Sequence, residues 1–262
     1  MLLLFAGGYL LGAVPFCYII GRLYGVDIRR VGSGNVGGTN LRRALKGKPV
    51  GVPMSIVGLV LDGVKGFMAA WALPGLALRY LVAATGHPTP GSYVAYVEWM
   101  EIAAGVAAVL GHTYTIFLRF RGGKGVATGL GMFLAICWQA ALTGLAVFLV
   151  VYLFSRIASL GSLIGAATVP IAAGLFYHFT DGMQAHEPVL AMLVAVVVLV
   201  FVRHRSNIQR LIRGEELSFR EQAQGNGAAP TGASSAAAGG PSGAGGDPPV
   251  ETAGEPVERH AH

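Results

Sequence analysis

Long apolar stretches with almost no charge are the feature of this sequence that most limits what it can fold into. A helix needs about 20 predominantly apolar residues to cross a bilayer. Seven stretches approach that length, at about 2–21, 53–73, 97–114, 126–140, 141–156, 162–178 and 188–203. Only 12% of the 262 residues are charged, whereas soluble domains carry about 25%. The sequence therefore predicts an all-α, polytopic integral membrane helical bundle.

The number of spans depends on the fourth and fifth stretches, which are short and nearly continuous. As one long helix they would leave six spans, and as two helices they make seven. With seven, the arginines and lysines of 22–52, 115–125 and 203–220 fall on one side, and the opposite loops carry only Arg79. Basic residues accumulate in cytoplasmic loops. The sequence therefore favours seven transmembrane helices, with the N-terminus outside and the C-terminus cytoplasmic.

The two ends of the chain differ in character. Residues 1–21 lack a charged leading region and a cleavage site, so we interpret them as a retained first span and not a signal peptide. Residues 221–262 are rich in Ala, Gly, Pro and Ser and have no periodic apolar face, which predicts a disordered cytoplasmic tail after a membrane-embedded domain at 1–220. The two cysteines, Cys17 and Cys137, lie in apolar stretches and are expected to be buried.

Three polar segments on the predicted cytoplasmic side are candidates for the functional site. The first is residues 32–43, GSGNVGGTNLRR. Glycines let backbone N–H groups form concave nests around an anion, and an arginine can add a bidentate contact. A flexible glycine-rich turn is the alternative. The candidate residues of this segment are Ser33, Gly34, Asn35, Gly37, Thr39, Asn40 and Arg43.

The second segment joins His112 to residues 117–128, FLRFRGGKGVAT. Gly122, Gly123 and Lys124 come just before the fourth span. Lys124 is therefore expected near a helix N-terminus, where free N–H groups and the helix dipole favour an anion. The segment is not a nucleotide-binding P-loop, because Gly125 follows the lysine where that motif needs Ser or Thr.

The third segment, residues 204–211, follows the last span and reads HRSNIQRL. His204 and Asn207 are three residues apart and would share one face of a helix. Asp62 and Lys65 have the same spacing inside the second span. Ionisable groups at membrane depth are usually paired, so this pair either positions helices or lies beneath the site.

Acidic residues are scarce on the predicted cytoplasmic side, where Asp27, Glu215 and Glu216 are nearly all of them. The sequence has no carboxylate pair suited to glycoside hydrolysis and no Gly-x-Ser-x-Gly motif. It also lacks a histidine followed five residues later by aspartate. A basic site with few carboxylates suits an anionic substrate with a good leaving group, such as an acyl phosphate. No nucleic acid, metal, cofactor or obligate protein partner is indicated.

Together the three segments and the Asp62–Lys65 pair resemble the bacterial glycerol-3-phosphate acyltransferases that use acyl phosphate, the PlsY family. The resemblance covers residues 1–216 and includes Gly214 and Glu215. It departs mildly from the family pattern at Val36, Gly38 and Arg121, where Pro, Ala and Lys are common. We expect the first two changes to loosen the first loop slightly.

The resemblance implies transfer of a fatty acyl group from acyl phosphate to the 1-hydroxyl of glycerol 3-phosphate, the first step of phospholipid biosynthesis. The products would be lysophosphatidic acid and phosphate, made at the cytoplasmic face of the bacterial inner membrane. By resemblance, Ser33, Lys124, His204 and Asn207 are the catalytic candidates, and the remaining candidates, including His112, bind substrate. Whether His204 is a base or a positioning group stays open. The alternative is a transporter or anion channel, which the one-sided clustering of polar residues disfavours.

Overall fold

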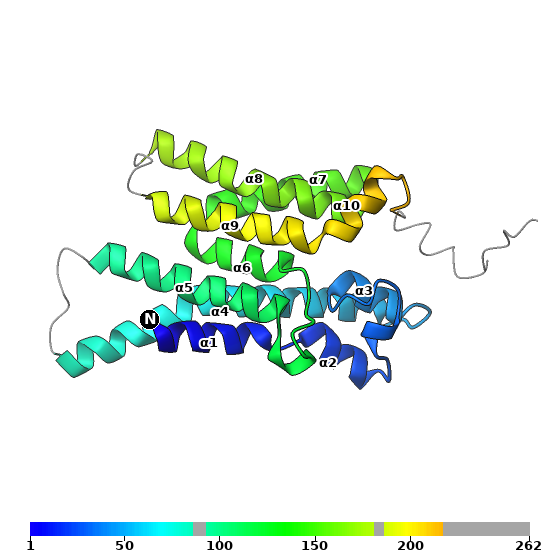
Figure 1. Cartoon of the computed structure of the whole chain (residues 1–262), viewed down its shortest axis with the longest axis horizontal. Helices are drawn as coiled ribbons and strands as arrows, with labels where there is room; N and C mark the ends of the chain where they lie inside the picture. The colour runs from blue at the N-terminus through cyan, green and yellow to red at the C-terminus, as the bar shows by residue number, and fades with distance from the viewer. Residues whose placement is uncertain (86–92, 181–185, 217–262) are drawn as a thin grey trace, which may run out of the picture. The chain divides into compact units, whose positions relative to one another are not determined.

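The structure is a computed structural model that describes residues 1–85, 93–180 and 186–216, which form helices joined by loops without any strand (Figure 1). The longer helices are α1 (Leu2–Ala13), α4 (Gly51–Thr85), α5 (Tyr93–Thr113), α6 (Val126–Ile136), α7 (Trp138–Ser155), α8 (Ala158–Phe179) and α9 (Glu187–Arg203). The shorter ones are α2 (Phe16–Leu23), η1 (Ile28–Arg30), α3 (Gly38–Ala44), η2 (Ile116–Leu118) and α10 (Arg205–Ile212). The all-helical prediction is confirmed for these residues.

The first predicted span is broken near its middle. Pro15 has no N–H group and separates α1 from α2. Lys65 of α4 donates a hydrogen bond to the backbone oxygen of Val14 at this break, at 2.8 Å. A carbonyl exposed by the interruption thus gains a charged partner from a neighbouring helix, which fixes α4 against the first span.

The fourth and fifth predicted stretches form two separate helices. The backbone of Cys137, at φ −146° and ψ 68°, leaves the helical region between α6 and α7. Arg156, just after α7, lines the same cavity as Lys124 and Val126, which lie at the start of α6. Helices α6 and α7 therefore turn back on each other as a hairpin. With 11 residues, α6 is about 16 Å long, roughly half the thickness of a bilayer's hydrocarbon core.

Five segments are long and apolar enough to cross a membrane, and the pair α9–α10, bent by 63°, would make a sixth. These segments are 2–23, 51–84, 96–118, 138–155 and 158–179. Seven spans and the orientation of the termini are not confirmed and stay predictions, because α6 falls short of a full crossing. The predicted tail at 221–262 lies outside the described residues.

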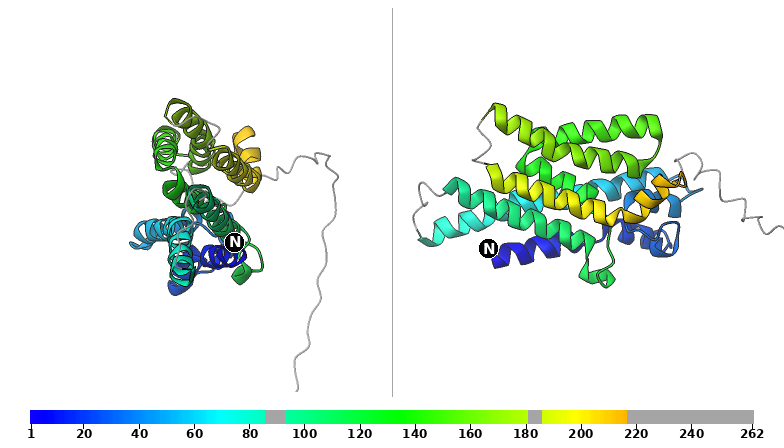
Figure 2. Two further views of the ribbon diagram at one scale, coloured as in Figure 1. Left: turned by 90° about the vertical axis from the view of Figure 1, so that its left-hand side faces the viewer. Right: turned by 45° about the horizontal axis from the view of Figure 1, so that its top comes forward.

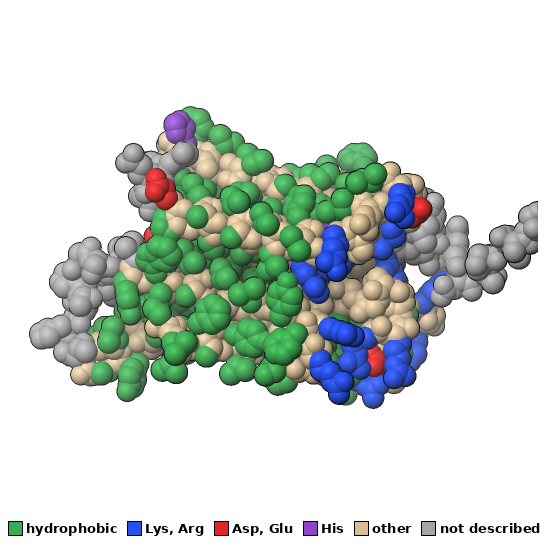
Figure 3. Space-filling view, viewed as in Figure 1, with side chains coloured by type: hydrophobic (Ala, Val, Ile, Leu, Met, Phe, Trp, Pro, Cys, Tyr) green, Lys and Arg blue, Asp and Glu red, His purple; other side chains and the backbone are tan. Residues whose placement is uncertain are grey.

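Close helix contacts bring the three polar segments to one end of the bundle. Helix α1 lies along α5, α4 contacts both α5 and α6, and α7 pairs with α8 (Figures 1 and 2). Glycines permit the closest of these approaches: a Cβ on Gly131 of α6 would lie 1.9 Å from the oxygen of Gly63 in α4. In the space-filling view, lysine and arginine side chains gather at the end of the molecule that carries α2, α3 and α10 (Figure 3).

Candidate functional site

A cavity of about 550 Å³ lies where the three polar segments meet. All four residues predicted to be catalytic line it, Ser33, Lys124, His204 and Asn207. Most of the predicted substrate-binding residues line it as well: Asn35, Gly37, Thr39, Asn40, Arg43 and His112. Residues more than 170 positions apart in sequence thus share one space. We call this space the acyl cavity, because most of its wall is apolar.

The buried side chain of Asn40 fixes the conformation of the first polar segment. This side chain is 1% exposed. Its Oδ1 accepts a hydrogen bond from the backbone N–H of Ser33 at 3.2 Å, and its Nδ2 donates to the oxygen of Ile28 at 2.7 Å. Gly32, at φ 54°, is needed here because a Cβ would lie 2.7 Å from Asn40 Oδ1. Asn40 therefore holds the loop that presents Ser33, and its amide is engaged by backbone.

Two departures from the family pattern in this loop have structural surroundings of their own. The side chain of Val36 is only 4% exposed and packs in a core cluster with Leu41 and Leu45. A Cβ on Gly38 would lie 2.9 Å from the oxygen of Ser55 in α4. Val36 thus fills the core and Gly38 permits close contact between α3 and α4, while the expected loosening of the loop stays a prediction.

The second polar segment folds back onto the end of α5. The N–H groups of Gly122 and Gly123 donate to the oxygens of Thr113 and His112, at 3.1 and 3.0 Å. A Cβ on Gly123 would lie 2.1 Å from Nε2 of His112. Gly123 does not line the cavity, and instead it forms the surface on which the His112 ring rests. Lys124 follows and, as predicted, precedes a helix, with Gly125 (φ 85°) as the N-cap of α6.

The third polar segment contributes two buried side chains at the bend between α9 and α10. His204 is 2% exposed and Asn207 is 5% exposed. His204 Nδ1 lies 2.8 Å from the oxygen of Val200. Because a carbonyl oxygen can only accept, Nδ1 carries the proton, and in the neutral ring Nε2 is an acceptor.

Glu216 completes the polar end of the cavity and was not among the predicted site residues. Lys124 Nζ donates to Asn207 Oδ1, and Asn207 Nδ2 donates to Glu216 Oε1 at 2.6 Å. Glu216 also accepts from Ser159 of α8 at 2.7 Å and from Arg210 of α10 at 2.5 Å. One carboxylate thus fixes the amide that holds the lysine and joins α10 to the start of α8.

The charges at this end alter the acid–base behaviour of Lys124 and Glu216. The pKa of Lys124 is lowered to about 8, mainly by burial; nearby Arg210, Arg43 and Arg203 also lower it, while Glu216 opposes the change. Burial also disfavours ionisation of Glu216. The hydrogen bonds from Arg210, Ser159 and Asn207 outweigh that effect, so its pKa lies below the usual value.

Beneath the polar end, Asp62 and Lys65 form the predicted ion pair, with 2.8 Å between Nζ and Oδ1. Cys17 donates to Asp62 Oδ2 at 3.4 Å, and His112 Nδ1 lies 3.7 Å from Asp62 Oδ1. Asp62 and His112 line the acyl cavity. The pair therefore joins the first span to α4, and its aspartate also forms part of the cavity wall.

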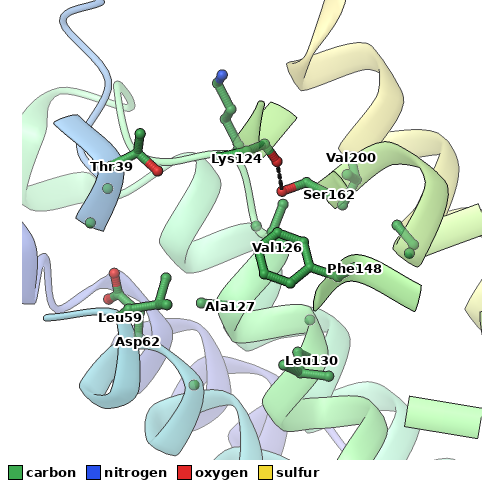
Figure 4. Close-up of a pocket in the computed structure, with 18 of the residues that line it drawn as sticks. Thr39, Leu59, Asp62, Lys124, Val126, Ala127, Leu130, Phe148, Ser162 and Val200 are labelled. Atoms are coloured by element: carbon green, nitrogen blue, oxygen red, sulfur yellow. Dashed lines mark hydrogen bonds between the residues drawn. The ribbon is translucent and has the colours of Figure 1, made fainter. Parts of the chain in front are cut away.

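The rest of the acyl cavity is apolar. Figure 4 shows Lys124 and Thr39 on one side, with Leu130 and Phe148 below them. The wall continues along α4, α6, α7, α8 and α9 with Val64, Phe67, Leu134, Leu145, Val169 and Val197. Leu134 is ten residues beyond Lys124, so the apolar part reaches on the order of 15 Å along α6. This space suits a hydrocarbon chain whose polar head lies near Lys124.

Gly34 and Gly122 line a second cavity, of about 600 Å³. This cavity shares Ser33, Asn35 and Lys124 with the first. Sequence reasoning missed the other residues around it because the signal for them, scattered arginines beside the motifs, is the same as that of any cytoplasmic loop.

A family model described as glycerol-3-phosphate acyltransferase matches residues 2–214. A glycerol-3-phosphate acyltransferase of Anaeromyxobacter dehalogenans (strain 2CP-1) is 45% identical over 215 residues, which cover 82% of this chain and 94% of the relative. The enzyme of the same name from Trichlorobacter lovleyi is 39% identical over 216 residues, covering 82% of this chain and 95% of the relative.

Two crystal structures are similar to the whole described bundle. Both are of PlsY, an integral membrane glycerol 3-phosphate acyltransferase. The glycerol 3-phosphate form has a TM-score of 0.65 and 36% identity, and the lysophosphatidic acid form has a TM-score of 0.62 and 34% identity. Each match covers 83% of this chain and 94% of the other.

Proposed function

The chain belongs to the glycerol-3-phosphate acyltransferase family, an integral membrane enzyme family whose activity is acyl transfer, and we propose that its acyl donor is acyl phosphate. The acceptor is glycerol 3-phosphate, attacked at its 1-hydroxyl, and the products are lysophosphatidic acid and phosphate. The observation that carries the proposal is a single cavity in which Lys124 and Arg43 lie beside a long apolar wall. A transporter function has no comparable support.

Each end of the acyl cavity has a role in this proposal. The acyl chain lies against Leu130 and Phe148, and the phosphates of both substrates lie near Lys124 and Arg43. Charge-assisted hydrogen bonds from these cations stabilise the leaving phosphate. Ser33 and Asn207 orient the reacting groups. The neutral His204 ring can accept a hydrogen bond at Nε2 from the acceptor hydroxyl.

The reaction forms one bond and breaks one. The 1-hydroxyl oxygen of glycerol 3-phosphate attacks the acyl carbon, and the bond from that carbon to the phosphate oxygen breaks. Phosphate leaves without strong acid assistance, which agrees with a site in which Glu216 is held ionised by three donors. The hydroxyl proton passes to His204 or to a substrate phosphate.

The donor is tested by offering two forms of one acyl group. Purified protein given palmitoyl phosphate and glycerol 3-phosphate is expected to release phosphate and form lysophosphatidic acid. Palmitoyl-CoA is expected to be used at least about a hundredfold less efficiently, because the cations beside the apolar wall suit a compact phosphate head. Comparable kcat/KM values for the two donors would contradict the proposal.

A dependence on pH follows from Lys124. Its pKa of about 8 means that the lysine is charged below pH 8 and loses its charge above it. The phosphate monoester is already a dianion there, since its second pKa is about 6. The KM for glycerol 3-phosphate is therefore expected to rise as pH increases through about 8. Lys124→Arg should move this rise to higher pH, because arginine keeps its charge; an unchanged profile would contradict the assignment.

We also propose seven membrane crossings with the N-terminus outside and the site at the cytoplasmic face of the bacterial inner membrane. The basic residues of the three polar segments support this orientation. Single cysteines at positions 30, 121 and 210, in a variant lacking Cys17 and Cys137, are expected to resist an impermeant thiol reagent in intact cells. Labelling at position 210 from outside would instead favour six crossings.

A further inference from the structure

The second cavity, of about 600 Å³, is lined by basic residues at the same end of the bundle. Its arginines come from three parts of the chain: Arg29, Arg30, Arg121, Arg203 and Arg205. Asp27 is its one acidic lining residue among those the structure describes, and Arg29 pairs with it at 2.7 Å. The cavity therefore carries a strong excess of positive charge. We call it the arginine port.

The inner wall of the port is held in place by contacts within the protein and is not merely a group of surface arginines. Arg203 Nη2 lies 3.5 and 3.4 Å from the oxygens of Gly122 and Gly123, and its guanidinium lies 5.4 Å from the ring of Tyr114. These contacts hold a cation against the loop that carries Lys124. The outer arginines, Arg30 and Arg205, are exposed to solvent.

The port and the acyl cavity meet at Ser33, Asn35 and Lys124, which line both. The two spaces differ sharply in chemistry. One has the apolar wall described above, and the other is lined by arginines. A water-soluble dianion and an apolar chain could therefore reach Lys124 from different directions, without either passing through the other's space.

We propose that the arginine port is the route by which glycerol 3-phosphate reaches Lys124 from water, while the acyl donor occupies the other cavity. A cleft lined by one sign of charge concentrates ions of the opposite sign and raises their association rate. The port therefore favours molecules that carry a phosphate group. This inference rests on the proposed function, because it takes glycerol 3-phosphate as the acceptor.

Charge reversal at the outer arginines tests the proposal. The double variant Arg30→Glu, Arg205→Glu should lower kcat/KM for glycerol 3-phosphate on the order of tenfold at low salt, and the difference should shrink as salt is added. The KM for acyl phosphate should change by less than about twofold, because the donor does not pass the port. Arg213→Glu is the matched control, since Arg213 is exposed at the same end but lines neither cavity.

Chemical modification of an introduced cysteine separates the effect of charge in the port from the effect of side-chain size. Ser206 is exposed and lines only the port, and both native cysteines are buried. In Ser206→Cys, a negatively charged sulfonatoethyl adduct should lower kcat/KM for glycerol 3-phosphate several-fold more than a positively charged trimethylammonioethyl adduct of similar size. Equal effects of the two adducts would overturn the proposal, as would an equal loss with both substrates.

An anionic lipid headgroup also carries a phosphate group and could bind to the port. A further experiment distinguishes lipid binding from the passage of glycerol 3-phosphate. The double variant is compared with the unchanged protein in bilayers of phosphatidylcholine alone and with added phosphatidylglycerol. A defect that persists in phosphatidylcholine alone supports the route for glycerol 3-phosphate. A defect that appears only with phosphatidylglycerol overturns it and assigns the port to lipid. Failure of the unchanged protein to use acyl phosphate would count against the donor and not against the port.

Discussion

Replacing Lys124 with alanine is expected to lower kcat/KM by a factor on the order of ten to a hundred. The lysine lies where the two cavities meet and is held there by Asn207. A hydrogen bond to a charged group contributes roughly 1.5–3 kcal/mol, and that range converts to the stated loss of transition-state stabilisation. The measurement is steady-state kinetics of purified protein with both substrates varied.

The control for this variant is Lys46→Ala, which removes an exposed lysine at the same end of the bundle that lines neither cavity. It should change kcat/KM by less than about twofold, because an isolated surface charge is largely screened. Arg43→Ala is expected to resemble Lys124→Ala. Near-normal kinetics for both Lys124→Ala and Arg43→Ala would show that the reaction takes place elsewhere.

Replacing Glu216 with alanine is expected to reduce both activity and stability. The change leaves Asn207, Ser159 and Arg210 without the carboxylate that accepts from all three. Leaving buried polar groups unpaired costs about 1–3 kcal/mol. The thermal midpoint should fall by several degrees, and kcat should fall on the order of tenfold because Asn207, no longer fixed by Glu216, holds Lys124 less firmly.

The neighbouring acid provides the matched control. Glu215 is exposed and lines neither cavity, so Glu215→Ala should leave both kcat and the thermal midpoint nearly unchanged. Glu216→Gln keeps the size of the side chain and one acceptor oxygen, and it should be less harmful than alanine. Equal effects at positions 215 and 216 would contradict the role given to Glu216.

The position of these two acids illustrates what could be predicted from the sequence and what could not. Helical spacing was sufficient for the Asp62–Lys65 pair, because residues three apart lie on one face of a helix. His204 instead lies at the 63° bend between α9 and α10, so its place beside the same cavity as Asn207 does not follow from a continuous helix. Glu215 and Glu216 are adjacent, so spacing along a helix cannot indicate which of the two faces the cavity. Gly214, at φ 68°, turns the chain just before them, and that turn decides which acid enters the cavity.

The length of α6 was unpredictable for a similar reason. The stretch 126–140 is predominantly apolar and has no charged residue, so composition favours one continuous span. Cys137 leaves the helical region and ends α6 after 11 residues. Asn40 lines the cavity, but its hydrogen bonds to Ser33 and Ile28 depend on how the loop closes. Patterns of residue type predict helices and faces, whereas loop closure depends on tertiary contacts.

The place of Glu216 in the chain has a consequence for biosynthesis. This carboxylate follows every described helix, and it anchors Asn207 and the start of α8. A nascent polypeptide can therefore insert all of these helices while the Asn207 amide still lacks its carboxylate partner. The hydrogen bonds at the polar end of the cavity can be complete only when translation has passed residue 216 and that residue has left the ribosomal tunnel.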